Sequence, residues 1–243
     1  MMDLRKNSIG NIVAEDFRTA AVFKKYGIDF CCRGGRTIEE ACKAKSTLNP
    51  EIIYEELTNL STKESNSIDF KSWQLDLLTD YVEKVHHFYV EDKSPIILGF
   101  LDKLCKVHGK NHPELYQVNE LFHETASELA AHLKKEELIL FPFIRKMAKA
   151  KRKNTELITP PFGTVENPVH MMEHEHTVEG ERFAKIAELT NNYTPPTDAC
   201  NTYKVTYAML QEFENDLHTH IHIENNILFP KSIQLEKELS VEN

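Results

Sequence analysis

Apolar residues recur every three or four positions along most of the chain, which is typical of amphipathic helices. In the first sixty residues this pattern predicts three short helices, over 11–26, 37–45 and 49–60. Gly27 follows the first of them and is expected to end it, because glycine readily adopts the backbone conformation that closes a helix. We therefore expect a small helical domain over residues 1–60.

The rest of the chain has a different organisation. A polar stretch without periodicity begins at residue 61, so we expect a linker over 61–70. Long helical patterns follow it, and four long helices joined by one longer connection predict a four-helix bundle over 71–236. No alternating pattern of the kind that predicts strands is found, so the expected fold class is all-α. The predicted bundle helices cover 71–92, 95–107 (after Ser94-Pro95), 114–148, 168–190 and 198–236.

Composition and charge exclude several classes of function. The chain has 243 residues and a formal net charge of -9, with 29 Lys and Arg against 38 Asp and Glu. This acidity disfavours a broad contact with nucleic-acid phosphates. No stretch approaches the roughly 20 apolar residues that cross a bilayer, and no secretory signal is visible. The charge and the lack of an apolar span therefore predict no nucleic-acid or membrane partner. The five cysteines are odd in number and irregularly spaced, so we expect a cytoplasmic protein without a disulfide framework.

The strongest local signal is a repeat of the form H-x-x-x-E-x-x-x-L-F-P, which begins at His132 and again at His220. Residues four apart share one face of a helix, so each copy aims an imidazole and a carboxylate, of Glu136 or Glu224, at one region. A single pair of this kind is usually a helix-stabilising ion pair. Two copies on apolar, inward-facing stripes would bury charges at considerable cost, and divalent cations would remove that cost. The repeat therefore predicts a metal site.

Other histidines are spaced so that they complete such a site. His86 and His87 precede the first copy on a neighbouring helix, and His174 and His176 precede the second in the same way. Helical periodicity leaves the choice between His86 and His87 open. His108 offers a further imidazole. Imidazoles and carboxylates without thiolates favour iron or manganese over a structural zinc, and two shared glutamates indicate a two-metal site.

Two adjacent cysteines form a separate candidate site. Cys31 and Cys32 lie in the segment DFCCRGGR and cannot pair with each other without strain. Arg33 and Arg36 make this turn electropositive, which lowers a thiol pKa and favours the nucleophilic thiolate. The alternative is that both are small side chains packed under a loop. Cys31 and Cys32 are therefore candidate catalytic residues.

Taken together, these motifs resemble those of a known family. The two H-x-x-x-E pairs are similar to those of the hemerythrin-like di-iron fold, and the segment from Asp29 to Cys42 resembles the ScdA-type N-terminal domain of the Repair of Iron Centres (RIC) proteins. The resemblance covers essentially the whole chain, with an insertion over 148–169. It implies two non-haem irons, bridged by the two glutamates and open to an oxo bridge. The iron ligands that it implies are His87, His108, His132, Glu136, His176, His220 and Glu224.

The family resemblance also implies a function. Its members repair iron–sulfur clusters damaged by nitric oxide or oxidative stress, by donating iron, by handling nitric oxide in the manner of a reductase, or by both. Cys31 and Cys32 would serve this activity as a thiolate relay. Damaged iron–sulfur proteins are the expected partners, nitric oxide or oxygen the expected small ligands, and a homodimer the expected assembly. The alternatives are a hemerythrin-like module that only binds oxygen or nitric oxide, and a redox stress sensor without turnover.

Overall fold

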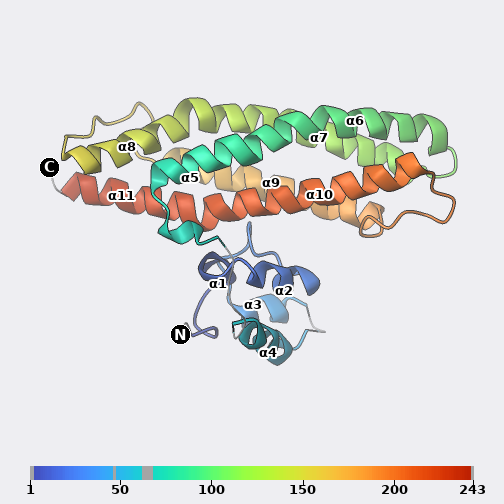
Figure 1. Ribbon diagram of the computed structural model, residues 1–243, viewed down its shortest axis with the longest axis horizontal. Helices are drawn as coiled ribbons and strands as arrows, with labels where there is room; N and C mark the ends of the chain where they lie inside the picture. Colours follow the sequence, from blue (N-terminus) through green and yellow to red (C-terminus); the bar gives the residue numbers. More distant parts are fainter. Residues whose placement is uncertain (1–2, 46–47, 62–67, 242–243) are drawn as a thin grey trace.

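The computed structural model describes residues 3–45, 48–61 and 68–241, and within these ranges it contains helices and no β-strand. Figure 1 shows two parts, a long bundle of helices and a smaller group of short helices beside it. The all-α fold class and the helical bundle predicted from the sequence are confirmed. In the described part of the chain, no helix combines the length and the apolarity that crossing a bilayer requires.

The N-terminal unit consists of the four short helices α1 (Ile9–Glu15), α2 (Thr19–Lys25), α3 (Ile38–Lys43) and α4 (Pro50–Ser61). The prediction of one helix over 11–26 is wrong, because the backbone is extended at Asp16 (φ -146°, ψ 100°). The Asp16 carboxylate accepts a hydrogen bond from the backbone N–H of Arg18 at 3.1 Å. Such local side-chain bonds compete with the helical hydrogen bonds and favour a break.

Local sequence signals do set the ends of the other short helices. Gly27 adopts a φ of +61° shortly after α2 ends, as expected for a glycine that closes a helix. Thr37 and Glu40 form a capping box at the start of α3, in which each side chain bonds the backbone N–H of the other residue. Phe23 and Ile53 are completely buried, and the apolar cluster around them continues into the bundle. The two parts of the molecule therefore share one core.

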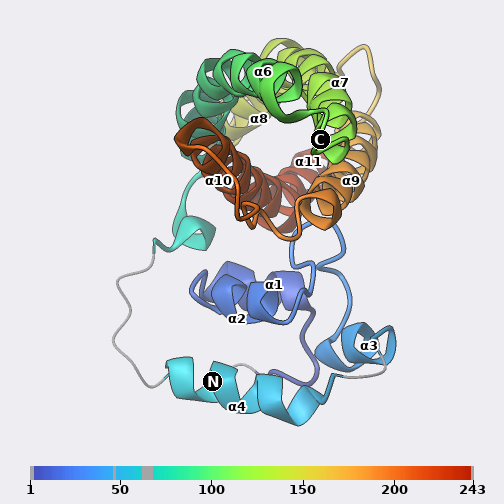
Figure 2. The ribbon, with the colours of Figure 1, turned by 90° about the vertical axis from the view of Figure 1, so that its right-hand side faces the viewer.

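The bundle is built from helical rods that run side by side (Figures 1 and 2). The rods contain, in chain order, α5 (Leu75–Tyr81) with α6 (Phe88–His108), α7 (Glu114–Lys135) with α8 (Phe141–Lys153), α9 (Glu166–Leu189), and α10 (Asn201–Ile223) with α11 (Phe229–Val241). Three of the rods contain a π-helical segment, at Val82–His87, Glu136–Leu140 and Glu224–Leu228. Figure 2 looks along the rods and shows the N-terminal unit on the side of α9 and α10.

The first rod is continuous where the sequence predicts a break. α6 passes through Pro95 without ending, although proline lacks the backbone N–H that would bond the carbonyl four residues earlier. The Ser94 hydroxyl donates to the carbonyl of Val90 at 2.6 Å, just before the proline. Ile97 and Leu101 follow it and are completely buried. Their packing in the bundle outweighs the local helix-breaking preference of proline.

Two connections frame the bundle. The linker predicted over 61–70 lies mostly outside the described residues, which resume at residue 68. Asp69 caps a short 3-10 helix, Phe70–Ser72, that leads into α5. The long connection between α8 and α9 begins at Asn154, whose φ of 49° ends α8 in the left-handed conformation.

Candidate metal centre

Six of the seven predicted ligands converge in the interior of the bundle, and every rod supplies at least one of them. None of the six side chains is more than 2% exposed. Three of them belong to the π-helical segments, which interrupt the regular helical geometry and often occur at functional sites. The six residues are His87, His132, Glu136, His176, His220 and Glu224.

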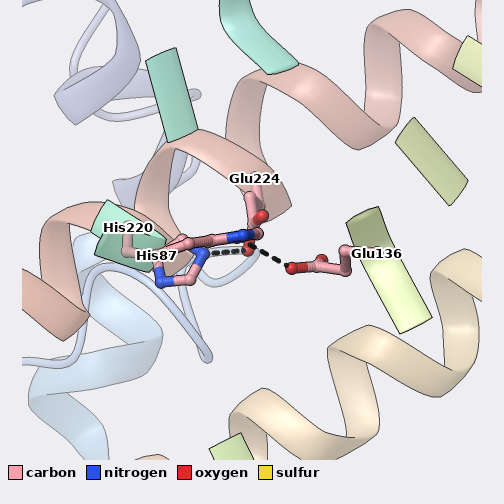
Figure 3. A group of neighbouring side chains, drawn as sticks. All are labelled: His87, Glu136, His220 and Glu224. Atoms are coloured by element: carbon pink, nitrogen blue, oxygen red, sulfur yellow. Dashed lines mark ion pairs between the residues drawn. The ribbon is translucent and has the colours of Figure 1, made fainter. Parts of the chain in front are cut away.

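The first half of the centre contains His87, Glu136, His220 and Glu224, whose ligand atoms all lie within 4.8 Å of one another. Figure 3 shows the two imidazoles and the two carboxylates facing a common point. The Nε2 atom of His87 lies 3.3 Å from Glu136 Oε2, and the Nε2 atom of His220 lies 3.1 Å from Glu224 Oε2.

The second half uses the same two glutamates with two other histidines, and its ligand atoms also lie within 4.8 Å of one another. His132 Nε2 is 3.4 Å from Glu136 Oε2, and His176 Nε2 is 3.2 Å from Glu224 Oε2. The two Nε2 atoms of His132 and His176 are 3.1 Å apart. Because Glu136 and Glu224 belong to both halves, each carboxylate is placed to bridge two cations.

The polar atoms of the centre fit cations better than they fit one another. Among the described residues, neither oxygen of Glu136 or of Glu224 has a hydrogen bond of acceptable geometry, and neither has the Nε2 atom of His87 or of His220. Buried polar atoms in native proteins are nearly always satisfied, and an uncompensated buried carboxylate costs several kcal/mol. Two cations that each accept two imidazoles and share the carboxylates would satisfy all of these atoms.

Residues outside the ligand set hold three of the imidazoles in place. His132 Nδ1–H donates to Glu175 at 2.8 Å, His176 Nδ1–H donates to the Asn225 side-chain oxygen at 2.8 Å, and His87 Nδ1–H donates to Glu137 at 3.1 Å. A proton fixed on Nδ1 leaves the Nε2 lone pair free for a cation. These three partners were not predicted from the sequence, although each lies directly beside a predicted ligand in the chain.

The Leu-Phe-Pro part of the repeat also serves the centre. Phe141 stacks on His87 at a ring-centroid distance of 5.5 Å, and Phe229 stacks on His176 at 6.1 Å with the rings 2° from parallel. Both phenylalanines are completely buried. Each copy of the repeat therefore supplies a histidine, a glutamate and an aromatic face, and the aromatic face supports a histidine from a different rod.

Burial and charge set the protonation of the centre. Burial lowers the pKa of His220 to about 3, so this imidazole is neutral and able to bind a cation. The hydrogen bond from His132, with help from Lys135, lowers the pKa of Glu175 to about 2. Burial raises the pKa of Glu136, and the neighbouring Glu224 adds to this effect by charge repulsion. A bound cation would oppose both effects on Glu136 and keep it ionised.

His108 and His86 lie outside the ligand clusters. His108 ends α6, 21 residues and about 30 Å along the helix from His87. Its Nε2 atom lies 3.2 Å from Cys200 Sγ, and its ring packs against Tyr203. The expectation that His108 joins the other ligands is therefore corrected. His86 is buried beside the centre, bonds Asp216 at 2.9 Å and stacks on the ring of His220, so the structure places His87 and not His86 in the cluster.

The adjacent cysteines lie at the boundary between the N-terminal unit and α9. Cys31 is buried and Cys32 is partly exposed, and Cys32 Sγ–H donates to the carbonyl of His176 at 3.2 Å. The expectation of a lowered thiol pKa is wrong for Cys31. A hydrogen bond with Cys32, together with burial, raises the pKa of Cys31 well above its ordinary value. Arg33 is engaged elsewhere, since its guanidinium pairs with Glu181 at 2.9 Å.

Comparison with known proteins agrees with this architecture. The family model of the hemerythrin HHE cation binding domain matches residues 84–232, and the model of the ScdA N-terminal domain, a domain of unknown function, matches residues 5–61. The iron-sulfur cluster repair protein ScdA of Staphylococcus haemolyticus is 29% identical over 95% of this chain and 99% of its own length. The iron-sulfur cluster repair proteins YtfE of Yersinia pestis and of Musicola paradisiaca are each 30% identical over 97% of this chain and 100% of their own length. The chain therefore belongs to the Repair of Iron Centres family, the iron-sulfur cluster repair proteins that join an ScdA-type N-terminal domain to a hemerythrin-like cation-binding domain.

Proposed function

We propose that this protein repairs iron–sulfur clusters damaged by nitric oxide or oxidants, and that repair depends on two iron ions held by the six clustered residues of the bundle. The clients would be the damaged iron–sulfur proteins themselves. The proposed domains are the N-terminal unit over 1–60, a linker over 61–70 and the metal-binding bundle over 71–236. We also propose that the protein is located in the cytoplasm, a reducing compartment, because all five cysteines are free thiols.

The observation that carries this proposal is the pair of shared carboxylates. Glu136 and Glu224 are each 0% exposed, take part in both halves of the centre and have no hydrogen bond to either oxygen within the described residues. Imidazole and carboxylate ligands suit iron, and neither half contains a thiolate. Bound irons would supply one-electron chemistry and coordination positions for nitric oxide or oxygen.

Residues around the centre orient the imidazoles and shield them from water. Glu137, Glu175 and Asn225 hold three imidazoles in the tautomer that presents Nε2 to the centre. Phe141 and Phe229 cover two of these rings with apolar surface. Repair also requires that iron or nitric oxide reach the client, and we assign this relay to Cys31 and Cys32, because the Cys32 thiol touches the backbone of His176.

The test compares cluster repair by iron-loaded wild type, Glu136→Gln and Glu120→Gln. The substrate is an iron–sulfur protein whose cluster has been destroyed with nitric oxide, and the return of its cluster absorbance is followed without oxygen. Glu136→Gln removes the charge of a bridging carboxylate, so we expect the repair rate to fall at least about tenfold. Glu120 is exposed on the same rod, and its variant should match the wild type.

Other outcomes would select another function. Equal repair by Glu136→Gln and wild type would separate repair from the metal centre. A wild type that forms a stable nitric oxide adduct and repairs nothing would be a binding module. If nitric oxide leaves the optical spectrum of the wild type unchanged and the wild type repairs no clusters, the protein would be a stress sensor.

A further inference from the structure

A second group of metal-ligating side chains lies outside the bundle interior, in the loop between α2 and α3. Asp29 Oδ1 lies 3.3 Å from Cys31 Sγ, and the Sγ atoms of Cys31 and Cys32 are 3.8 Å apart. One ligand atom from each of the three residues lies within 4.8 Å of the other two. Asp29 Oδ1 also accepts the backbone N–H groups of Cys31 and Cys32, at 2.9 and 3.0 Å, which fixes the turn.

The spacing of the two sulfur atoms matches a tetrahedral cation. Zinc-like cations bind thiolate sulfur at about 2.3 Å, so two sulfurs at a tetrahedral angle are separated by about 3.8 Å. The observed Sγ–Sγ distance of 3.8 Å equals this value. A carboxylate oxygen on the same cation would lie about 3.6 Å from each sulfur, and the observed 3.3 Å between Asp29 Oδ1 and Cys31 Sγ needs only a small adjustment.

The surroundings leave room for a cation and for a further ligand. The three side chains line a cavity of about 760 Å³ between the N-terminal unit and the helices α9 and α10. Gly180 of α9 faces Cys32, and a Cβ atom at this position would lie only 3.1 Å from Cys32 Sγ. The thiol of Cys32 reaches the carbonyl of His176, a ligand of the proposed iron centre. The group is therefore open to the cavity and next to the bundle site.

Binding of a dication to this group would be coupled to the loss of thiol protons. Without a cation, a hydrogen bond with Cys32, burial and the charge of Asp29 hold the pKa of Cys31 well above its ordinary value. Binding of a dication would release two thiol protons to solvent and form two metal–sulfur bonds and one metal–oxygen bond. No electron is transferred in this step. One coordination position would remain open toward the cavity.

We propose that Asp29, Cys31 and Cys32 bind one thiophilic divalent transition-metal cation, with an open position that a thiolate of a client protein can fill. If the protein repairs clusters as proposed above, the cation would be Fe²⁺ in transit between the bundle centre and the client. Only this identity of the cation rests on the proposed function. The binding itself rests on the geometry of these three residues.

Cobalt(II) tests this proposal directly. We would add Co²⁺ without oxygen to the full chain after its bundle centre has been loaded with iron. Thiolate ligands give an intense near-ultraviolet charge-transfer band and tetrahedral cobalt gives visible bands, whereas a centre of imidazoles and carboxylates gives no thiolate band. We expect both the thiolate band and the tetrahedral cobalt bands to appear with one equivalent of Co²⁺. The Cys31→Ser/Cys32→Ser variant should lose the thiolate band, and Asp29→Asn should weaken Co²⁺ binding at least tenfold.

Two controls keep the result interpretable. Cys200→Ser removes the exposed thiol beside His108 and should leave both bands unchanged. In the wild type, Co²⁺ should protect Cys31 and Cys32, and no other cysteine, from alkylation. This measurement uses the wild type alone, so it does not depend on the folding of a variant. Loss of the bands in Cys200→Ser, or failure of Co²⁺ to protect Cys31 and Cys32, would overturn the proposal. Neither result would alter the iron content of the bundle, so the proposed function would stand or fall separately.

Discussion

At the scale of single residues, the metal centre depends on side chains that are not themselves proposed ligands. Glu175 links His132 to Lys135, so that one carboxylate both orients an imidazole and is itself held in place. Asn225 and Glu137 orient His176 and His87 in the same manner. By contrast, the Nδ1 atom of His220 has no hydrogen-bond partner among the described residues, and its ring is held by stacking on His86 at 5.6 Å.

The orienting role of Glu175 leads to a first prediction. Glu175→Gln replaces an ionised acceptor by a weaker neutral one, so His132 should bind iron less well. Loss of an orienting partner typically lowers metal affinity about 10–100-fold, and we expect a decrease in this range. Competition with a chelator measures it. Glu173→Gln, two positions away on the same helix, should leave the affinity unchanged; an equal loss in both variants would refute the orienting role.

The residue scale also shows how far the sequence could predict the site. The repeat that begins at His132 and His220 predicted four of the proposed ligands, because a spacing of four along a helix fixes their common face. Neither the orienting partners nor the distance between His108 and the centre follows from spacing within one helix. Both depend on how the rods are placed side by side, which only the packed structure reveals.

At the scale of elements, three π-helical segments lie at the level of the centre, and the Leu-Phe-Pro sequences follow two of the glutamates. Sequence periodicity predicted the rods but not these interruptions, because a π-helical segment adds a single residue to a turn. It also predicted a helix boundary at Pro95, where burial keeps the helix continuous. It predicted none at Asp16, where a local hydrogen bond favours a break. Element types were therefore predictable, whereas these two boundaries depend on a local hydrogen bond at Asp16 and on the packing of the residues after Pro95.

The stacking of Phe229 on His176 gives a prediction at this scale. Phe229→Leu keeps most of the apolar volume but removes the aromatic face, so we expect the free energy of unfolding to fall by about 1 kcal/mol. Iron should also be released faster to a chelator. Phe213→Leu is the matched control, because Phe213 is equally buried but packs against Phe122 and Phe183. It should cost similar stability without faster release, and faster release in both variants would argue against the stacking role.

At the scale of the whole molecule, the N-terminal unit is docked on the part of the bundle that carries the centre. Asn226, two residues after Glu224, donates to the carbonyl of Phe30 at 3.4 Å and packs against Gly10 and Gly34. The rings of Phe17 and Phe30 pack on His222. The sequence predicted two parts but gave no sign of this contact, because its residues are scattered over short segments far apart in the chain.

Gly10 allows a prediction about this docking. A Cβ atom at Gly10 would overlap the side chain of Asn226, so Gly10→Ala should lower the free energy of unfolding by about 1–3 kcal/mol through overpacking. Hydrogen exchange should also become faster in the backbone amides of α1. Gly35→Ala is the control, because a Cβ atom there has no neighbour within 4 Å. Unchanged exchange in Gly10→Ala would show that the N-terminal unit does not depend on this close approach.

We propose that two irons share the carboxylates of Glu136 and Glu224. Metal analysis combined with Mössbauer spectroscopy, on protein purified without oxygen, tests it most directly. The shared carboxylates predict about two irons per chain, magnetically coupled through their bridges, and loss of that coupling in Glu136→Gln. A chain with a single iron, with two uncoupled irons, or with the same spectrum in Glu136→Gln would show that the two carboxylates do not bridge a pair of irons.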